Sequence, residues 1–157
     1  MKTLNILLVS IAVLLMMSCN KKEVKKGLEV KNNGLTFTEA YLTLDGNKTT
    51  ASEFSMNAEI KYAVKGIQGY IEKDSLVYLG ASLTVVDMDG KEVLNYPDLF
   101  SEYDATGVSP DQAKDVTLFL TIGSPMLTGE DYIWKTRIWD KNGKGEITSE
   151  TVITVVK

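Results

Sequence analysis

Much of the chain alternates between apolar and polar residues, the pattern of strands that bury one face. Residues 57–65 and 116–122 alternate most strictly, and both are rich in β-branched and aromatic side chains. A period of two with these residue types predicts half-buried strands. Six further segments show the pattern in longer or shorter form: 28–30, 35–44, 76–86, 92–95, 131–139 and 146–156. We therefore expect about seven or eight strands.

The residues between these segments suit tight turns between antiparallel strands. Three pairs combine Asp or Asn with Gly, which tolerate the positive φ of hairpin turns: Asp45-Gly46, Asp89-Gly90 and Asn142-Gly143. Residues 109–112, Ser-Pro-Asp-Gln, combine an N-cap, a proline at the first helical position and a capping glutamine, and they predict a single helical turn. Short strands joined in this way predict an all-β fold, an antiparallel immunoglobulin-like β-sandwich.

Composition removes several classes of function. The 157 residues suit one domain with appendages, and they include one cysteine and no histidine. An internal disulfide, a CxxC site, a histidine-ligated metal and a catalytic triad with histidine are therefore excluded. No serine stands in an S-x-x-K or G-x-S-x-G context. We expect a protein that is not an enzyme and needs no cofactor.

The first eighteen residues have a lysine near the start and an apolar run from Ile6 to Met17, interrupted only by Ser10. Twelve helical residues span about 18 Å, whereas the hydrocarbon core of a bilayer is about 30 Å thick. The run therefore matches the apolar part of an export signal better than a transmembrane helix. Ser18, a small residue, comes directly before Cys19, the single cysteine.

This arrangement resembles the signal peptides of bacterial lipoproteins, in which a small residue precedes the cysteine that is lipidated. Ser18 and Cys19 match the motif, and Met16 stands where the family most often has leucine. The resemblance implies cleavage before Cys19, a diacylglyceryl thioether on its sulfur and an acylated amino terminus, which together would anchor the protein stably. By the same resemblance, Asn20 favours the outer membrane, on its periplasmic or its outer surface. The alternative is an ordinary secretory signal followed by a leftover thiol.

We divide the chain into a signal peptide at 1–18, the lipidated Cys19 with a flexible lysine-rich tether at 19–27, and a β-sandwich domain at 28–157. The whole chain carries 17 basic and 21 acidic residues, and the tether holds four of the lysines. The domain is therefore more acidic than the chain as a whole, and we expect no nucleic-acid partner.

Three segments near the end of the chain also resemble a known class of domain. They are the glycine-marked segment 123–129, Tyr132, and the sequence DKNGKG at 140–145. They are similar to the closing strands of immunoglobulin-like domains in bacterial lipoproteins. The resemblance implies the same β-sandwich fold and brings no catalytic residue with it.

Residues 140–151, DKNGKGEITSET, look at first like a calcium-binding EF-hand loop, with Asp140 and Asn142 where that loop places ligands. However, Lys144 places an ammonium where the third oxygen ligand belongs, and Thr151 replaces the terminal glutamate. The flanking residues alternate like strands and not like helices. We therefore interpret this segment as a hairpin turn, with Asp140 and Asn142 as weak metal candidates only.

A second group of carboxylates lies in the irregular stretch 97–115, where Asp98, Glu102 and Asp104 are joined by two later aspartates. Oxygen-rich loops bind Ca²⁺, and paired carboxylates hydrolyse glycosides. Solvated loop carboxylates are the common alternative. We expect no metal here, and we keep Asp98, Glu102 and Asp104 as weak candidates.

The strand predicted at 131–139 carries the candidate binding residues. Lys135, Arg137 and Trp139 share one face, and a four-residue hairpin turn would pair Trp139 with Glu146 and Lys135 with Glu150. A tryptophan beside cationic side chains can stack a sugar ring or anchor a protein. The alternative is that Trp139 folds over the end of the sandwich while Arg137 pairs with a carboxylate.

These observations predict a membrane-anchored lipoprotein that binds or assembles with a protein partner at the cell envelope and does no catalysis. A glycan-binding module that uses Trp139 and neighbouring tyrosines is the alternative, and a small hydrolase is less favoured. A shallow groove at an exposed Trp139 would support the glycan, whereas a flat apolar sheet face or an unpaired edge strand would support the protein partner. We expect four tyrosines to be core or sheet-surface residues: those at 41, 62, 70 and 78.

Overall fold

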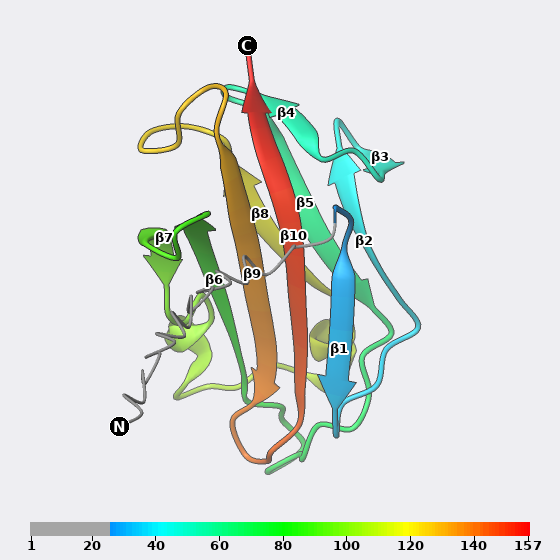
Figure 1. Ribbon diagram of the computed structural model, residues 1–157. Helices are drawn as coiled ribbons and strands as arrows, with labels where there is room; N and C mark the ends of the chain where they lie inside the picture. Colours follow the sequence, from blue (N-terminus) through cyan, green and yellow to red (C-terminus); the bar gives the residue numbers. More distant parts are fainter. Residues whose placement is uncertain (1–25) are drawn as a thin grey trace, which may run out of the picture.

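The computed structural model describes residues 26–157, whose strands form two sheets packed face to face (Figure 1). The large sheet has the order β1-β10-β9-β6-β7 and is antiparallel, with β4 joining the end of β10 in parallel. The small sheet is antiparallel throughout, in the order β3-β2-β5-β8. The large sheet comprises β1 (Glu29–Asn33), β4 (Glu53–Ser55), β6 (Leu79–Asp87), β7 (Glu92–Tyr96), β9 (Asp131–Asp140) and β10 (Glu146–Val156). The small sheet comprises β2 (Glu39–Leu44), β3 (Asn47–Thr49), β5 (Glu59–Lys65) and β8 (Val116–Thr121). The predicted antiparallel β-sandwich is confirmed.

Each segment predicted from alternation coincides with a strand, but several bounds were wrong. Residues 35–38 and 76–78 form only isolated bridges, such as the pair Thr36 and Gln68, and the strands begin at Glu39 and Leu79. The strands β3 and β4 were not predicted because three residues are too short to show a period.

The predicted helical turn is present as α1 (Pro110–Ala113), and a short 3₁₀ helix η1 (Ser101–Tyr103) precedes it. The Ser109 side chain accepts a hydrogen bond from the Gln112 N–H at 3.3 Å, and the Gln112 side chain accepts one from the Ser109 N–H at 3.1 Å. This reciprocal capping box satisfies donors that a helix start leaves free. The turn leads the chain into β8.

The core lies between the sheets and is built from the inward residues of the alternating pattern. Tyr62 of β5 and Trp134 of β9 meet at its centre, with their rings edge to face and their centroids 6.4 Å apart. Such aromatic pairs add about 0.5–1.5 kcal/mol beyond the area that they bury. Both side chains are almost fully buried, so this contact joins the middle strands of the two sheets.

A small cluster of polar side chains is buried within this core. The hydroxyls of Thr136 and Ser149 share a hydrogen bond of 2.7 Å. The Tyr62 hydroxyl and the Trp134 indole N–H have no hydrogen-bond partner among the described residues. Burial raises the pKa of Tyr62 to about 12, and the nearby hydroxyls of Ser149 and Thr136 offset this only in part. The phenol therefore keeps its proton at neutral pH.

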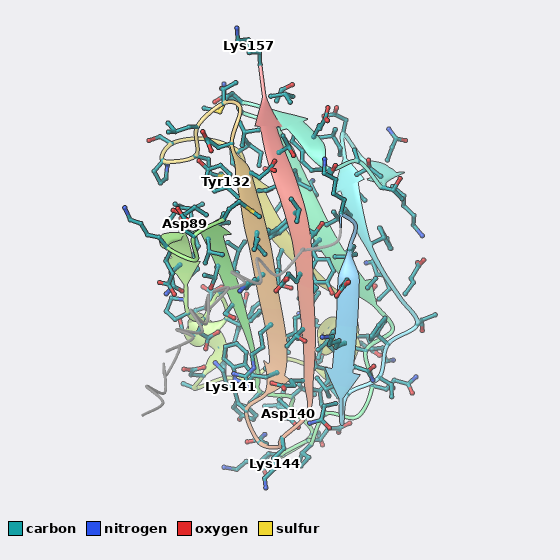
Figure 2. The ribbon with its side chains drawn as sticks, in the orientation of Figure 1. Asp89, Tyr132, Asp140, Lys141, Lys144 and Lys157 are labelled. Atoms are coloured by element: carbon teal, nitrogen blue, oxygen red, sulfur yellow. The ribbon has the colours of Figure 1, made fainter. Side chains whose placement is uncertain are left out.

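The predicted signal peptide at 1–18, Cys19 and most of the tether at 19–27 lie outside the described residues. Within residues 26–157, no helix is long and apolar enough to cross a membrane. Figure 2 places Asp140, Lys141 and Lys144 around the β9–β10 hairpin, at the opposite end of the sandwich from Lys157. We refer to this hairpin end as the loop end, because residues 66–78 and 97–115 also gather there (Figure 1).

Candidate functional site

The three candidate binding residues lie on the outer face of the large sheet, in the predicted register. Trp139 stands opposite Glu146, and Lys135 stands opposite Glu150. The Arg137 Nε lies 2.7 Å from Glu146 Oε2, and the Lys135 Nζ lies 3.9 Å from Glu150 Oε2. This face is therefore a ladder of paired charges rather than a flat apolar surface.

Trp139 is held by its own sheet. A Cβ on Gly80, the cross-strand neighbour in β6, would lie 2.2 Å from the indole Cε2 and Cζ2, so the ring rests directly on the Gly80 main chain. The Arg137 guanidinium lies over the ring, with its Cζ 4.9 Å from the centroid. One ring face is thus covered by Gly80 and Arg137 stacks on the indole, which leaves little free surface for a sugar to stack on.

The hairpin at 140–145 is organised around a buried carboxylate and not around a calcium loop. Asp140 is 3% exposed. Its Oδ2 accepts a hydrogen bond from the Ile71 N–H at 2.8 Å, and its Oδ1 accepts one from the Asn142 N–H at 2.9 Å. A Cβ on Gly143 would lie 2.5 Å from Oδ2, so a glycine is needed at that turn position. Asp140 therefore ties the 66–78 loop to the hairpin.

Two carboxylates of the acidic loop are brought together, and a lysine lies between them. The Lys141 Nζ is 2.5 Å from Asp98 Oδ2 and also pairs with Asp104. Asp98 Oδ1 accepts hydrogen bonds from the N–H groups of Phe100 at 2.9 Å and Ala81 at 3.3 Å. Glu102 is exposed in η1 and takes no part in this cluster.

The charges of this cluster stabilise one another. Burial alone would raise the pKa of Asp98, but hydrogen bonds from Lys141, Phe100 and Ala81 outweigh it and hold that pKa below its usual value. Burial alone would lower the pKa of Lys141, and its two aspartate partners raise it instead. The Lys141 ammonium thus occupies the position between Asp98 and Asp104 that a metal ion bound by both would take. Among the described residues, no group of three or more Asp, Glu or Cys is arranged to hold a metal ion.

Beside this cluster the surface is hollowed into a pocket of about 330 Å³, which we call the loop-end pocket. The side chains around it come from three separate loops and mix charged, amide, aromatic and small groups: Lys73, Tyr78, Asp104, Ala105, Lys141 and Asn142. Lys141 contributes both its charge and its main chain, because its N–H donates to the Tyr78 carbonyl at 2.8 Å. That bond extends the β6–β9 pairing beyond its last pair, Leu79 and Asp140, so the pocket adjoins the predicted binding face.

Local backbone geometry explains why these loops meet. Gly107 has a φ of 62°, and a Cβ at that position would lie 3.2 Å from Tyr78 Cζ, so the 97–115 segment passes close beside the Tyr78 ring. Lys73 precedes a tight turn in which Asp74 and Ser75 both have positive φ. The Asn142 Nδ2 donates to the Ile71 carbonyl at 3.3 Å. The pocket walls are therefore fixed by backbone contacts.

Another hollow, of about 270 Å³, lies between β1 and β2 at the side of the sandwich. Its lining carries no charged or amide side chain and combines apolar residues such as Leu28 and Val30 with hydroxyls from Tyr41 and three threonines. The loop-end pocket adds charged and amide groups that this hollow lacks, so we place the candidate site there.

The other predicted tyrosines occupy structural positions. Tyr62 is in the core, and Tyr41 is on the outer face of the small sheet with the Lys48 Nζ 4.0 Å from its ring centroid. Tyr70 is half-buried beside Asp140, and its hydroxyl has no hydrogen-bond partner among the described residues. Burial, and then the Asp140 charge, raise the pKa of Tyr70 well above its usual value.

Comparisons with known proteins identify the fold but not a family. No protein-family model matches the chain, and a search of characterised proteins finds no match. The structure is similar to that of the C-terminal domain of Wzt, with a TM-score of 0.55 and 12% sequence identity over 85% of this chain and 83% of that one. At this identity the likeness shows the fold alone, and the described part of the chain is an immunoglobulin-like β-sandwich.

Proposed function

We propose that the chain is a lipid-anchored, non-catalytic binding module of the bacterial cell envelope, and that it recognises a glycan at the loop-end pocket. The anchor rests on Cys19 and the lipoprotein-like segment before it. The first strand begins at Glu29, so only a short tether separates the proposed anchor from the sandwich. An outer-membrane location follows from the same resemblance.

The observation that carries the glycan proposal is the mixed lining of the loop-end pocket. Sugar hydroxyls both donate and accept hydrogen bonds, so they need donors and acceptors close together. Lys73 donates, Asp104 accepts, and the Asn142 amide carries groups of both kinds. Tyr78 adds an aromatic ring of the kind that packs against the apolar face of a sugar.

The charges of the pocket also narrow the ligand class. Asp104 keeps a half-exposed carboxylate at the rim, with its side chain 58% accessible. The chain as a whole carries a net charge of −4. Around the pocket itself the charges balance, because Lys73 and Lys141 stand beside Asp98 and Asp104, and a neutral or weakly charged sugar is compatible with this balance. Trp139 lies next to the pocket but is held by Gly80 and Arg137, so we assign it to the scaffold of the site.

The proposal is tested with the full chain in detergent, applied to an array of bacterial glycans. Tyr78→Ala removes the proposed stacking ring and should weaken binding by about tenfold or more, which corresponds to about 1.4 kcal/mol. Tyr96→Ala is the matched control, because Tyr96 is a 50% exposed tyrosine of β7 that does not line the pocket. Equal losses in both variants, or no glycan bound by the unsubstituted chain, would contradict the proposal.

Assembly with a protein partner is the second candidate, and a specific surface favours it. Tyr96, Leu99 and Tyr103 are 50%, 38% and 37% exposed, and they follow one another along β7 and the segment after it. Exposed aromatic side chains of this kind commonly anchor protein contacts. Crosslinking in native membranes should then capture a partner that Tyr96→Ala loses and Tyr78→Ala keeps. A partner that is lost in Tyr78→Ala and kept in Tyr96→Ala would exclude this surface as the contact.

A further inference from the structure

The strand β8 forms an open edge of the small sheet. It ends the order β3-β2-β5-β8, and within the described residues it pairs only with β5. Edge strands are usually protected from further pairing by charges or proline. The other outer strands carry such charges, for example Glu29 in β1, Lys48 in β3 and Glu92 in β7. β8 has the sequence VTLFLT, with no charge and no proline.

The free hydrogen-bonding groups of this edge can be assigned from the pairing with β5. Beyond the end of β8, the Ile122 N–H donates to the Ala58 carbonyl at 2.9 Å, so Ile122 directs its main chain toward the β5 side. In an antiparallel pair, successive residues point their N–H and C=O groups alternately toward one neighbour and away from it. The main-chain groups of Thr121, Phe119 and Thr117 therefore point to the open edge.

These residues belong to a sequence that reads the same in both directions. Residues 117–121 are Thr-Leu-Phe-Leu-Thr, a palindrome centred on Phe119, and the flanking residues Val116 and Ile122 are both β-branched and apolar. We propose that this edge pairs with a second copy of the same chain, β8 against β8, antiparallel about a two-fold axis at Phe119. The two small sheets would then form one continuous sheet.

The palindrome makes every cross-strand pair of this arrangement favourable. Phe119 of one copy meets Phe119 of the other, Thr117 meets Thr121, and Leu118 meets Leu120. Each free N–H at the edge meets a free C=O, because Thr117, Phe119 and Thr121 occupy matching positions on the two strands. Aromatic pairs and threonine pairs are among the stabilising cross-strand neighbours. A slip by one residue would place inward leucines against outward side chains.

At one end of the edge, Thr117 shares a hollow with Phe100 and Tyr103, so that loop must leave room for the second copy. Phe119 is 53% exposed on the outer face of the small sheet. The Lys61 Nζ lies 5.0 Å from its ring centroid and is itself 3.5 Å from Glu59 Oε1, so the charge nearest the seam is already paired. In the proposed register Asp115 stands opposite Gly123, so no like charges face each other along the strand.

The seam is one short strand from each copy, which is small beside a stable interface of about 1,600 Å². Association in dilute solution is therefore expected to be weak. Two copies tethered to one membrane would meet at a much higher effective concentration. The contact is argued from β8 and does not depend on the glycan proposal, but its strengthening at a membrane rests on the proposed lipid anchor. It lies apart from the surface of Tyr96, Leu99 and Tyr103 to which the assembly candidate is assigned.

Disulfide trapping in native membranes tests the register directly with the full chain. Two single variants, Thr117→Cys and Thr121→Cys, are co-expressed as a mixture of separate chains. They should form a disulfide-linked dimer, because opposed residues have Cα atoms about 5.5 Å apart, within disulfide range. Thr117→Cys alone should not, because its two copies lie about 14 Å apart along the seam. We expect about tenfold more dimer from the mixture than from either variant alone. The unsubstituted chain, whose single cysteine is Cys19, sets the background.

Equal yields from the mixture and from each variant, or no dimer in any sample, would overturn the proposal. Introducing Phe119→Lys into both cysteine variants should abolish the crosslink, because two ammonium groups would then meet at the two-fold axis. Leu127→Lys, at a 64% exposed leucine in the loop after β8 and outside the proposed seam, should leave it unchanged.

Hydrogen exchange of the unsubstituted chain gives a readout that needs no variant. The amides of Thr117, Phe119 and Thr121 should exchange about tenfold more slowly as the protein concentration in the membrane is raised. Fast exchange at every concentration would overturn the proposal as well.

Discussion

Replacing Asp140 with alanine should strongly destabilise the sandwich, because this almost fully buried carboxylate accepts hydrogen bonds from main-chain N–H groups of its own hairpin and of the 66–78 loop. Asp140 is 3% exposed and accepts hydrogen bonds from Ile71 and Asn142 at 2.8 and 2.9 Å. Hydrogen bonds to a charged group contribute about 1.5–3 kcal/mol each, and two of them would be lost. Asp140→Ala should therefore lower the free energy of unfolding by about 3–5 kcal/mol. Urea denaturation followed by circular dichroism measures this difference.

Asp89→Ala is the matched control, because Asp89 is an exposed aspartate at the β6–β7 hairpin. Its free energy of unfolding should change by less than about 0.5 kcal/mol. Added calcium should not alter either result, since each oxygen of the Asp140 carboxylate already accepts a main-chain hydrogen bond. Two results would refute the structural role assigned to this carboxylate. One is a change of less than about 0.5 kcal/mol for Asp140→Ala, and the other is an increase in the stability of the unsubstituted chain when calcium is added.

Three further outcomes follow from the packing and the charges. Gly80→Ala would place a Cβ 2.2 Å from the Trp139 ring; the indole must leave the sheet, which should shift its fluorescence to the red and cost about 1–3 kcal/mol. The pKa of Tyr62 is raised to about 12 by burial, so stability should fall as the pH rises above about 10, by up to about 3 kcal/mol near pH 12. Tyr62→Phe should weaken this dependence in denaturant titrations, and an unchanged dependence would contradict the assignment. The pKa of Asp98 is held below its usual value by Lys141 and two N–H groups, against the opposing effect of burial; its contribution is therefore present above about pH 4 and lost as the pH falls through the lowered pKa. Thermal unfolding between about pH 2 and pH 5 should show a smaller decline in Lys141→Met than in the unsubstituted chain.

The sandwich could be predicted from the sequence because its strands are long and strictly alternating. The pairing of Trp139 with Glu146 and of Lys135 with Glu150 followed from the hairpin alone, and the structure confirms it. Local spacing fixes the register of a hairpin in this way. Local spacing could not show that Trp139 packs on Gly80, which belongs to a different strand much earlier in the chain.

The candidate site was harder to predict from the sequence, because its residues come together only in the folded chain. Lys73, Tyr78 and Asp104 are widely separated in sequence and meet only because the loops fold back at one end of the sandwich. Asp140 was recognised at a turn, but its bond to the Ile71 N–H joins residues 69 positions apart. The positive φ of Gly107, which brings the acidic loop to Tyr78, has no local signature that sets it apart from other glycines.

The central claim is most directly tested by nuclear magnetic resonance titration of the full chain in detergent with the glycans that bind on the array. The account predicts saturable shifts at the loop-end pocket, centred on Tyr78 and Asn142 and abolished by Tyr78→Ala. The Tyr96→Ala control should titrate like the unsubstituted chain. Shifts confined to other surfaces, or shifts at the pocket that persist in Tyr78→Ala, would contradict it.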